Sequence, residues 1–188
     1  MSILHTLVGW DTALFHFLNS SLSNPVFDAL LPWCREKWIW APLYLFIGAY
    51  SLLNFPKRGW IILLGLIAVV GLSDGISSEL IKKNVRRLRP CNDPAVATTM
   101  QLRIDCGSGF SLPSSHAANH FAVAVFLIGL FGKEYRWLKP AALFWAGLIA
   151  FSQVYVGVHF PIDVLIGGWL GSLIGWLVAR LVRRVLRM

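Results

Sequence analysis

Apolar residues along the chain gather into five long segments that short polar stretches separate. The segments cover residues 38–55, 59–81, 114–132, 139–158 and 162–182. Because a helix rises about 1.5 Å per residue, each segment can cover roughly the 30 Å of a bilayer's hydrocarbon core. The pattern therefore predicts an all-α fold, a polytopic membrane helical bundle with about five transmembrane helices.

The first 34 residues have a weaker apolar pattern. They favour two short amphipathic helices that break near Asn24 and Pro25, with Trp10 and Trp33 as anchors at the membrane surface. We therefore treat residues 1–188 as a single membrane-embedded domain. Its interfacial helices lie in 1–34 and its transmembrane core in 38–182.

Composition supports a membrane protein, because 56% of the 188 residues are hydrophobic. The net charge of +8 indicates an anionic partner. Nucleic acid is a poor candidate for that partner, since the basic residues are divided among short loops that flank the apolar segments. Membrane lipids and a lipid phosphate fit this distribution better.

Loop charges predict how the chain crosses the membrane. With five spans, three basic clusters fall on one side: Lys57 and Arg58; Lys133, Arg136 and Lys139; Arg180, Arg183, Arg184 and Arg187. The positive-inside rule makes that side cytoplasmic. The N-terminal segment, the 82–113 region and the 153–162 turn then face the exterior or periplasm of a bacterial plasma membrane.

A second group of cations lies on the predicted outer side, where cations should be sparse: Lys82, Lys83, Arg86, Arg87, Arg89 and Arg103. Contact with lipid headgroups is one explanation. If the helix continues, however, Lys82 and Arg89 lie seven residues apart on nearly one face, with Arg86 close to both. Cations gathered on one stripe repel one another unless an anion lies among them, so the spacing favours an anion site.

Two further stretches place histidines on the same side. In "SLPSSHAANHF", Pro113 suits the first turn of a helix, where free N–H groups, Ser114, Ser115 and His116 can bind phosphate, although a simple helix cap also explains the motif. His120 is interpreted as structural. In "HFPID", Asp163 can accept a hydrogen bond from His159, which leaves the other imidazole nitrogen as a nucleophile or base.

These three elements, in this order, resemble the type-2 phosphatidic acid phosphatase superfamily, which includes vanadium haloperoxidases. The family pattern is K-x6-R-P, P-S-G-H and S-R-x5-H-x3-D; here it reads Lys82 to Arg89-Pro90, Pro113-Ser114-Ser115-His116, and Ser152-Gln153 to His159 and Asp163. The resemblance implies that His159 forms a phosphohistidine, Asp163 orients it, and His116 protonates the leaving oxygen. It also implies that Lys82, Arg89, Ser114 and Ser115 hold the phosphate, with no metal and no cofactor.

Two positions depart from the family pattern. Ser115 replaces a glycine and can still donate a hydrogen bond. Gln153 replaces an arginine, which keeps a donor and loses a charge; a charged hydrogen bond contributes about 1.5–3 kcal/mol against about 1 kcal/mol for a neutral one. We expect Arg86 to supply the missing charge, because it lies on the expected stripe of Lys82 and Arg89.

Other polar residues have structural interpretations. Glu79 is expected to pair with the lysines that follow it, and Asp74 to meet a polar partner between helices. Gly167, Gly171 and Gly175 allow close helix packing, within the chain or in a dimer, with the former favoured. Cys91 and Cys106 are candidates for a disulfide worth roughly 3 kcal/mol in an oxidising compartment, with Cys34 left free.

The leading hypothesis is an enzyme, a metal-independent membrane phosphatase that hydrolyses a lipid phosphate or diphosphate at the outer face. Undecaprenyl diphosphate, phosphatidylglycerophosphate, phosphatidate and lipid A all fit the motifs. A non-catalytic lipid-phosphate binder or transporter is the alternative, and the set His116, His159 and Asp163 argues against it. A haloperoxidase does not fit the membrane spans. The sequence leaves the oligomeric state open.

Overall fold

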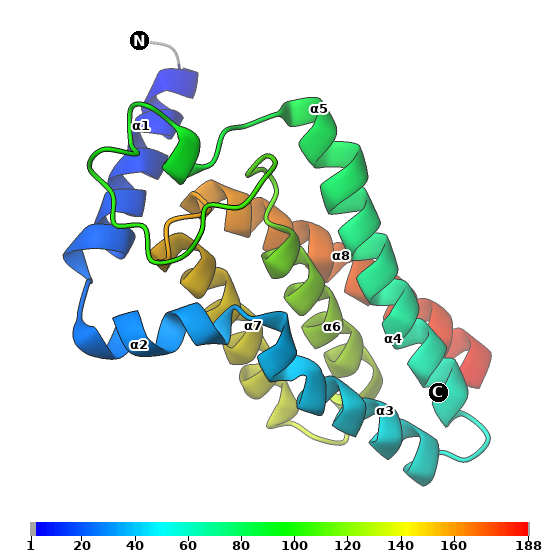
Figure 1. The fold of residues 1–188 in the computed structure, drawn as a ribbon. Helices are drawn as coiled ribbons and strands as arrows, with labels where there is room; N and C mark the ends of the chain where they lie inside the picture. Colours follow the sequence, from blue (N-terminus) through cyan, green and yellow to red (C-terminus); the bar gives the residue numbers. More distant parts are fainter. Residues whose placement is uncertain (1–2, 188) are drawn as a thin grey trace.

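The computed structural model describes residues 3–187, which form helices and loops with no strand (Figure 1). The all-α fold class predicted from the apolar pattern is confirmed. The main helices are α1 (Ile3–His16), α2 (Pro25–Cys34), α3 (Ala41–Asn54), α4 (Gly59–Asp74), α6 (Ser115–Phe131), α7 (Leu138–Tyr155) and α8 (Pro161–Leu186).

Two helices of the described residues are long and apolar enough to cross a membrane. They are Gly59–Asn92, with a mean hydropathy of 2.0, and Pro161–Leu186, with 1.7. The first joins α4 to a π-helical stretch (Gly75–Lys82) and to α5 (Lys83–Val85); its continuous helix ends there, and a 3₁₀ turn (Pro90–Asn92) follows the non-helical residues 86–89. Ser115–Phe131 is apolar but shorter. The count of about five transmembrane helices therefore stays a prediction.

The N-terminal segment breaks where its sequence predicted. A π-helical turn that follows α1 ends at Ser21, and α2 begins at Pro25. Asn24 caps α2, since its side chain accepts a hydrogen bond from the Phe27 amide at 2.9 Å. Trp10 and Trp33 are 74% and 65% exposed, as expected of side chains that meet headgroups.

Helix α6 lies at the centre of the bundle and packs on α4, α7 and α8 (Figure 1). Its contact with α8 depends on Gly167, Gly171 and Gly175, which lie one turn apart. A Cβ atom at any of the three would collide with a backbone carbonyl at the start of α6. These glycines therefore pack α8 against α6 within the chain, which is the interpretation the sequence favoured over dimerisation.

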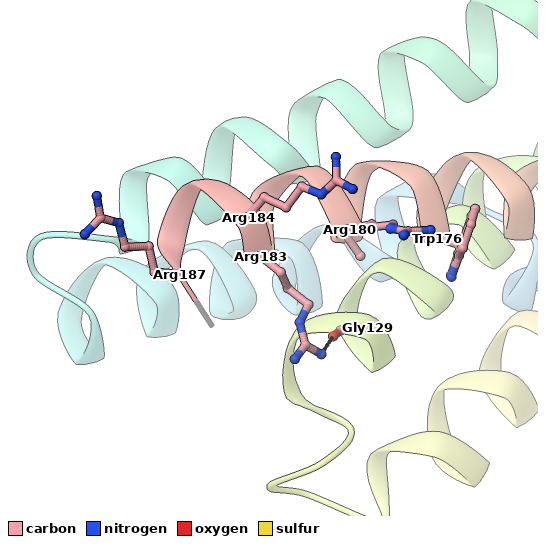
Figure 2. A pocket seen from close by; sticks show the side chains of 7 residues that line it. Gly129, Trp176, Arg180, Arg183, Arg184 and Arg187 are labelled. Atoms are coloured by element: carbon pink, nitrogen blue, oxygen red, sulfur yellow. Dashed lines mark hydrogen bonds between the residues drawn. The ribbon is translucent and has the colours of Figure 1, made fainter.

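The last turns of α8 carry four arginines around a shallow pocket beside the end of α6 (Figure 2). Arg183 turns back and donates a hydrogen bond of 2.9 Å to the Gly129 carbonyl, which helps to satisfy the C-terminal end of α6. Arg180 stacks over the Trp176 ring. This end of the bundle is opposite the end where α6 and α8 begin (Figure 1).

The long loop between α5 and α6 is held in place by polar contacts. Arg103 donates hydrogen bonds to the Tyr155 carbonyl at 2.7 Å and to Asp28 at 2.5 Å, and its guanidinium stacks on the Tyr155 ring. Buried Asn19 bonds the backbone of Gln101. The loop, drawn green in Figure 1, is thereby fixed beside α1 at the N-terminal end of α8.

Candidate active site

A cavity of about 560 Å³ opens at the end of the bundle where α6 and α8 begin. Its lining joins residues from widely separated parts of the chain. The lining residues with polar side-chain groups are Arg35, Lys37, Tyr44, Asp74, Ser78, Lys82, Arg89, Ser115, His116, Asn119, His120, Gln153 and His159. The structure therefore brings most of the sequence-predicted site residues to one place.

His159 lies in the loop between α7 and α8 and is 2% exposed. Its backbone N–H donates to the Gln153 carbonyl at 3.3 Å. The ring Nδ1 lies 3.6 Å from Oδ2 of Asp163, which is longer than an ordinary hydrogen bond, and it has no other partner among the described residues. With Nδ1 facing this carboxylate, a proton on Nδ1 leaves Nε2 as the free nitrogen.

Asp163 is completely buried in the first turn of α8. Pro161 begins that helix, where its missing N–H costs nothing. Oδ2 of Asp163 accepts from the Phe160 amide at 2.8 Å, and Oδ1 accepts from Arg87 at 2.7 Å. The carboxylate is therefore held in one orientation beside His159.

Burial lowers the pKa of His159 to about 4, although Asp163 opposes this by raising it. At neutral pH the imidazole is then uncharged and its free nitrogen carries a lone pair. A neutral, oriented imidazole in a cavity can act as a nucleophile or base.

His116 and Ser115 line the cavity from the first turn of α6. The Ser115 hydroxyl shares a 2.9 Å hydrogen bond with Ser78. Ser114 is placed differently from the expectation: its buried hydroxyl accepts from the Ala117 amide and caps α6, and its own amide donates to the Asp163 carbonyl at 2.9 Å. Ser114 ties the two helix starts together and is absent from the cavity lining.

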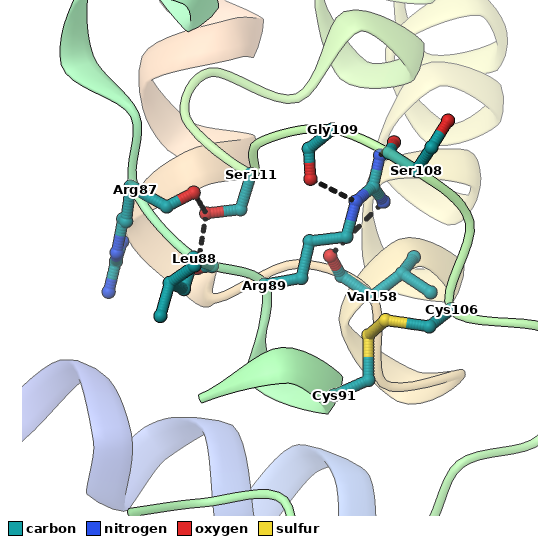
Figure 3. Close-up of a disulfide and its surroundings, with 9 residues drawn as sticks. All are labelled: Arg87, Leu88, Arg89, Cys91, Cys106, Ser108, Gly109, Ser111 and Val158. Atoms are coloured by element: carbon teal, nitrogen blue, oxygen red, sulfur yellow. Dashed lines mark hydrogen bonds between the residues drawn. A yellow bond between two sulfur atoms is a disulfide. The ribbon is translucent and has the colours of Figure 1, made fainter. Parts of the chain in front are cut away.

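Lys82 and Arg89 both line the cavity, although the helix that their seven-residue spacing assumed ends at Val85, between them. Arg89 follows the end of α5 and donates only long hydrogen bonds, at 3.4–3.5 Å, to the carbonyls of Ser108, Gly109 and Val158 (Figure 3). Close by, Cys91 and Cys106 form a disulfide with Cα atoms 5.9 Å apart. This pairing fixes the loop that supports the Arg89 guanidinium.

Arg86 does not join them, which corrects the expectation from sequence. The helix ends at Val85 instead of continuing, and Arg86 has a left-handed backbone conformation with φ of 53°. Its exposed side chain turns back to the Lys83 carbonyl at 3.0 Å. The three-cation stripe assumed an unbroken helix, so the geometry that placed Arg86 with Lys82 and Arg89 is wrong.

Arg87 and Asp11 are functional candidates that the sequence did not suggest. The Arg87 guanidinium bridges Asp163 and Asp11, at 2.7 and 2.6 Å. Asp11 in α1 also accepts from the Ile162 amide at 2.9 Å. The N-terminal helix thereby buttresses the carboxylate behind His159.

Arg35 and Lys37 also line the cavity, from the end of α2 and the turn that follows it. Sequence reasoning missed them, although both precede the first apolar segment and so lie on the predicted outer side. Gln153 lines the same cavity.

The remaining polar lining residues pair with one another. Asp74 accepts from the Asn119 amide at 3.3 Å, which is the interhelical partner expected for it, and Glu79 forms the expected ion pair with Lys83. His120 contacts the His116 carbonyl at 2.8 Å through Nδ1 and packs on Trp145. Within residues 3–187, no cluster of three or more His, Cys, Asp or Glu side chains is placed to hold a metal ion.

The arrangement joins an oriented neutral imidazole, a second imidazole and several cations in one cavity. This set is suited to binding a phosphate and transferring it, because phosphoryl transfer depends on positioning and charge stabilisation. Fold and site together define a helical protein of the phosphotransfer or phosphatase class.

Comparison with known proteins identifies the family. A sequence profile described as the PAP2 superfamily matches residues 58–187. The chain is 34% identical over 173 residues to a lipid A 4'-phosphatase of Bacteroides thetaiotaomicron, covering 89% of this chain and 74% of that protein. It is 26% identical over 173 residues to an undecaprenyl-diphosphatase of Sulfolobus acidocaldarius, covering 90% and 77%.

Its fold is similar to the crystal structure of a transmembrane PAP2-type phosphatidylglycerolphosphate phosphatase from Bacillus subtilis. The TM-score is 0.76 at 25% identity, and the match covers 96% of this chain and 88% of that one. The chain belongs to the PAP2 superfamily. The resemblance drawn from the three motifs is therefore confirmed.

Proposed function

We propose that this chain is a multi-pass membrane enzyme that hydrolyses a lipid phosphate or diphosphate through a phosphohistidine at His159. Kinship with PAP2 phosphatases supports its being a lipid phosphatase. One observation carries the mechanism. The buried His159 faces Asp163 through Nδ1, in a cavity that also holds His116, Lys82 and Arg89.

In the first step, Nε2 of His159 attacks phosphorus while the bond from phosphorus to the leaving oxygen breaks. The Nδ1 proton stays beside Asp163, which stabilises the charge that develops on the ring. His116 donates a proton to the leaving oxygen, since a bound phosphate dianion favours its imidazolium form. Lys82, Arg89 and the amides at the start of α6 stabilise the charge on the phosphoryl oxygens.

In the second step, water attacks the phosphohistidine and the P–N bond breaks. His116, now neutral, takes a proton from that water, so the two histidines return to their starting states. Inorganic phosphate leaves. Each step balances without a redox partner, and the cationic side chains supply the electrostatic stabilisation that a metal ion would otherwise give.

The substrate we propose is an amphiphile with an exposed phosphate or diphosphate. The similar proteins act, by their names, on lipid A and on undecaprenyl diphosphate, which share that chemistry. Large apolar side chains remain exposed on α3, α4 and α8, including Leu53, Leu64 and Leu165, and suit contact with lipid tails. The basic end of α8 supports placing the cavity at the opposite, outer face of a bacterial cell membrane.

The alternative, a non-catalytic lipid-phosphate binder, accounts less well for the site. A binder needs cations but has no use for a buried imidazole held against a carboxylate. Two hydrogen bonds, from Arg87 and from the Phe160 amide, hold Asp163 in the orientation that faces His159.

Release of inorganic phosphate from a panel of lipids tests the proposal. The panel comprises lipid A, undecaprenyl diphosphate, phosphatidate and phosphatidylglycerophosphate, presented to purified protein in detergent. At least one lipid should be turned over by wild type and none by His159→Ala. If wild type binds these lipids but does not turn them over, the non-catalytic alternative would be favoured.

A further inference from the structure

Gln153 lines the cavity with a buried side-chain amide that lacks hydrogen-bond partners among the described residues. Its side chain is 0% exposed, and neither Nε2 nor Oε1 has a hydrogen-bond partner among the described residues. A buried polar group without a partner costs about 1–3 kcal/mol. The amide is therefore placed to bond a molecule that enters the cavity it lines.

Arg35 lines the same cavity and also has a buried polar atom without a hydrogen-bond partner among the described residues. Its side chain is 19% exposed, and its buried Nε has no partner within residues 3–187. The one ion pair that it forms, from Nη1 to Glu36, is long at 3.5 Å. The two parallel N–H donors of a guanidinium match the geometry of a phosphate, so this group is available for an anion.

Arg35 is better placed to bind an anion than the nearby Lys37 is. Lys37 also lines the cavity, but its side chain is exposed and its ammonium lies 5.1 Å from the centroid of the Trp38 ring. Arg35 lies within electrostatic range of both His116 and Arg89, which are at the proposed reaction centre.

The charges of the lining support an anion at this position. Four cationic side chains line the cavity against one carboxylate, Asp74, which Asn119 already engages. Cations held together in a partly buried site are stabilised when an anion lies among them. Arg35 and His159 line the same cavity, so an anion bound there has both side chains around it.

We infer that Arg35 and the Gln153 amide together bind the phosphate held at His159, with Arg35 supplying the positive charge that residue 153 lacks. This inference rests on the proposed function and adds to it, since it makes the end of α2 part of the active site. The N-terminal segment is then a phosphate-binding element as well as a membrane anchor.

Kinetics and phosphate binding test the inference together. The variants are Arg35→Ala, Arg35→Lys, Gln153→Arg and the double change Arg35→Ala with Gln153→Arg, in the full chain in detergent. Lys83→Ala is the matched control, because it removes an exposed cation next to Lys82 outside the cavity. One readout is kcat/KM on the best lipid of the panel; the other is the affinity for inorganic phosphate by calorimetry.

We expect Arg35→Ala to lower kcat/KM by about 10²–10³-fold, the scale for one preorganised donor, and to weaken phosphate binding. Arg35→Lys should retain more activity, and Lys83→Ala should stay within about threefold of wild type. The kcat/KM of the double variant should be at least tenfold higher than that of Arg35→Ala, because an arginine at position 153 would supply a cation to the same cavity.

Three results would overturn the inference. Arg35→Ala could match Lys83→Ala in both readouts, the double variant could recover nothing, or Arg35→Lys could be as impaired as Arg35→Ala while phosphate affinity is unchanged. If Arg35→Ala does not fold, Arg35→Gln, which keeps the side-chain length without the charge, gives the same comparison. A wild type that binds phosphate but turns over no lipid would contradict the proposed function instead.

Discussion

Nη1 of Arg87 lies 2.7 Å from Oδ1 of Asp163, and Nη2 of the same guanidinium lies 2.6 Å from Asp11. The carboxylate that faces His159 is thus joined to α1 through a single side chain. Arg87 lies 22% exposed and stacks over the Phe160 ring. Arg87 is not among the described residues that line the cavity, so its role would be to position Asp163.

Replacing Arg87 should therefore weaken catalysis without abolishing it. Loss of a charged hydrogen bond costs about 1.5–3 kcal/mol, so we expect kcat/KM of Arg87→Ala to fall roughly 10–100-fold. The effect should appear mainly in kcat, because the phosphate-binding cations remain. Arg87→Lys should restore part of it.

Arg86→Ala is the matched control for that experiment, because Arg86 is exposed and bonds only its own helix end. It should stay near the wild-type rate. Equal losses in Arg86→Ala and Arg87→Ala would contradict the positioning role. A continuous helix would place Arg86 beside Lys82 and Arg89 and would make Arg86→Ala the more damaging change, so the comparison also separates the two geometries.

The pH at which His159 becomes protonated should reflect the burial of its ring. Because burial lowers its pKa to about 4, the imidazole stays neutral from pH 7 to about pH 5 and becomes protonated only as the pH falls through 4. Nuclear magnetic resonance of histidine-labelled protein, with the signal assigned by its loss in His159→Gln, can follow this titration. A midpoint near the ordinary value of about 6.5 would show that the ring is more solvated than the structure indicates.

The disulfide should stabilise the loop between α5 and α6 and the site beside it. Cys91 and Cys106 enclose a 15-residue separation, for which loop closure predicts roughly 3 kcal/mol. Cys91→Ser with Cys106→Ser should lower the midpoint of thermal unfolding and reduce activity, since Arg89 bonds this loop. Mass spectrometry of unreduced protein should find neither thiol alkylated. Modification of both in folded protein would argue against the bond.

Activity should survive excess chelator. The charge of the phosphate is met by Lys82, Arg89 and the amides of α6, which need no divalent ion. Phosphate release with EDTA present should equal that in buffer alone. Complete loss that added Mg²⁺ restores would contradict the metal-independent mechanism.

Short sequence motifs predicted much of the site, because each motif concerns residues that lie close together in the chain. Lys82 and Arg89 reach the cavity, and His159 lies against Asp163, as the motifs indicated. The apolar segments also anticipated the helices, with α6 at 115–131 against an expected 114–132. The helix bounds and the contact of His159 with Asp163 depend on one helix or one turn, whereas Arg89 reaches the cavity from beyond the helix end at Val85.

What the sequence could not show depends on contacts between distant segments or on where a helix stops. Arg35 is 118 residues from Gln153, and no local pattern links them. Arg86 was misplaced because the helix was assumed to run on past Val85, where the chain in fact adopts a left-handed turn. Ser114 was assigned to phosphate on its residue type, whereas its hydroxyl is used by the helix cap.

The nucleophile is the central claim, and rapid-quench trapping with a ³²P-labelled lipid phosphate tests it most directly. Wild type should accumulate a protein-bound phosphate that is stable in alkali and labile in acid, as expected of a phosphohistidine, and peptide mapping should locate it at His159. His159→Ala should form none and should lose on the order of 10⁴-fold in turnover, as when a covalent step is removed. Labelling at another residue, or turnover by His159→Ala within about tenfold of wild type, would contradict the mechanism.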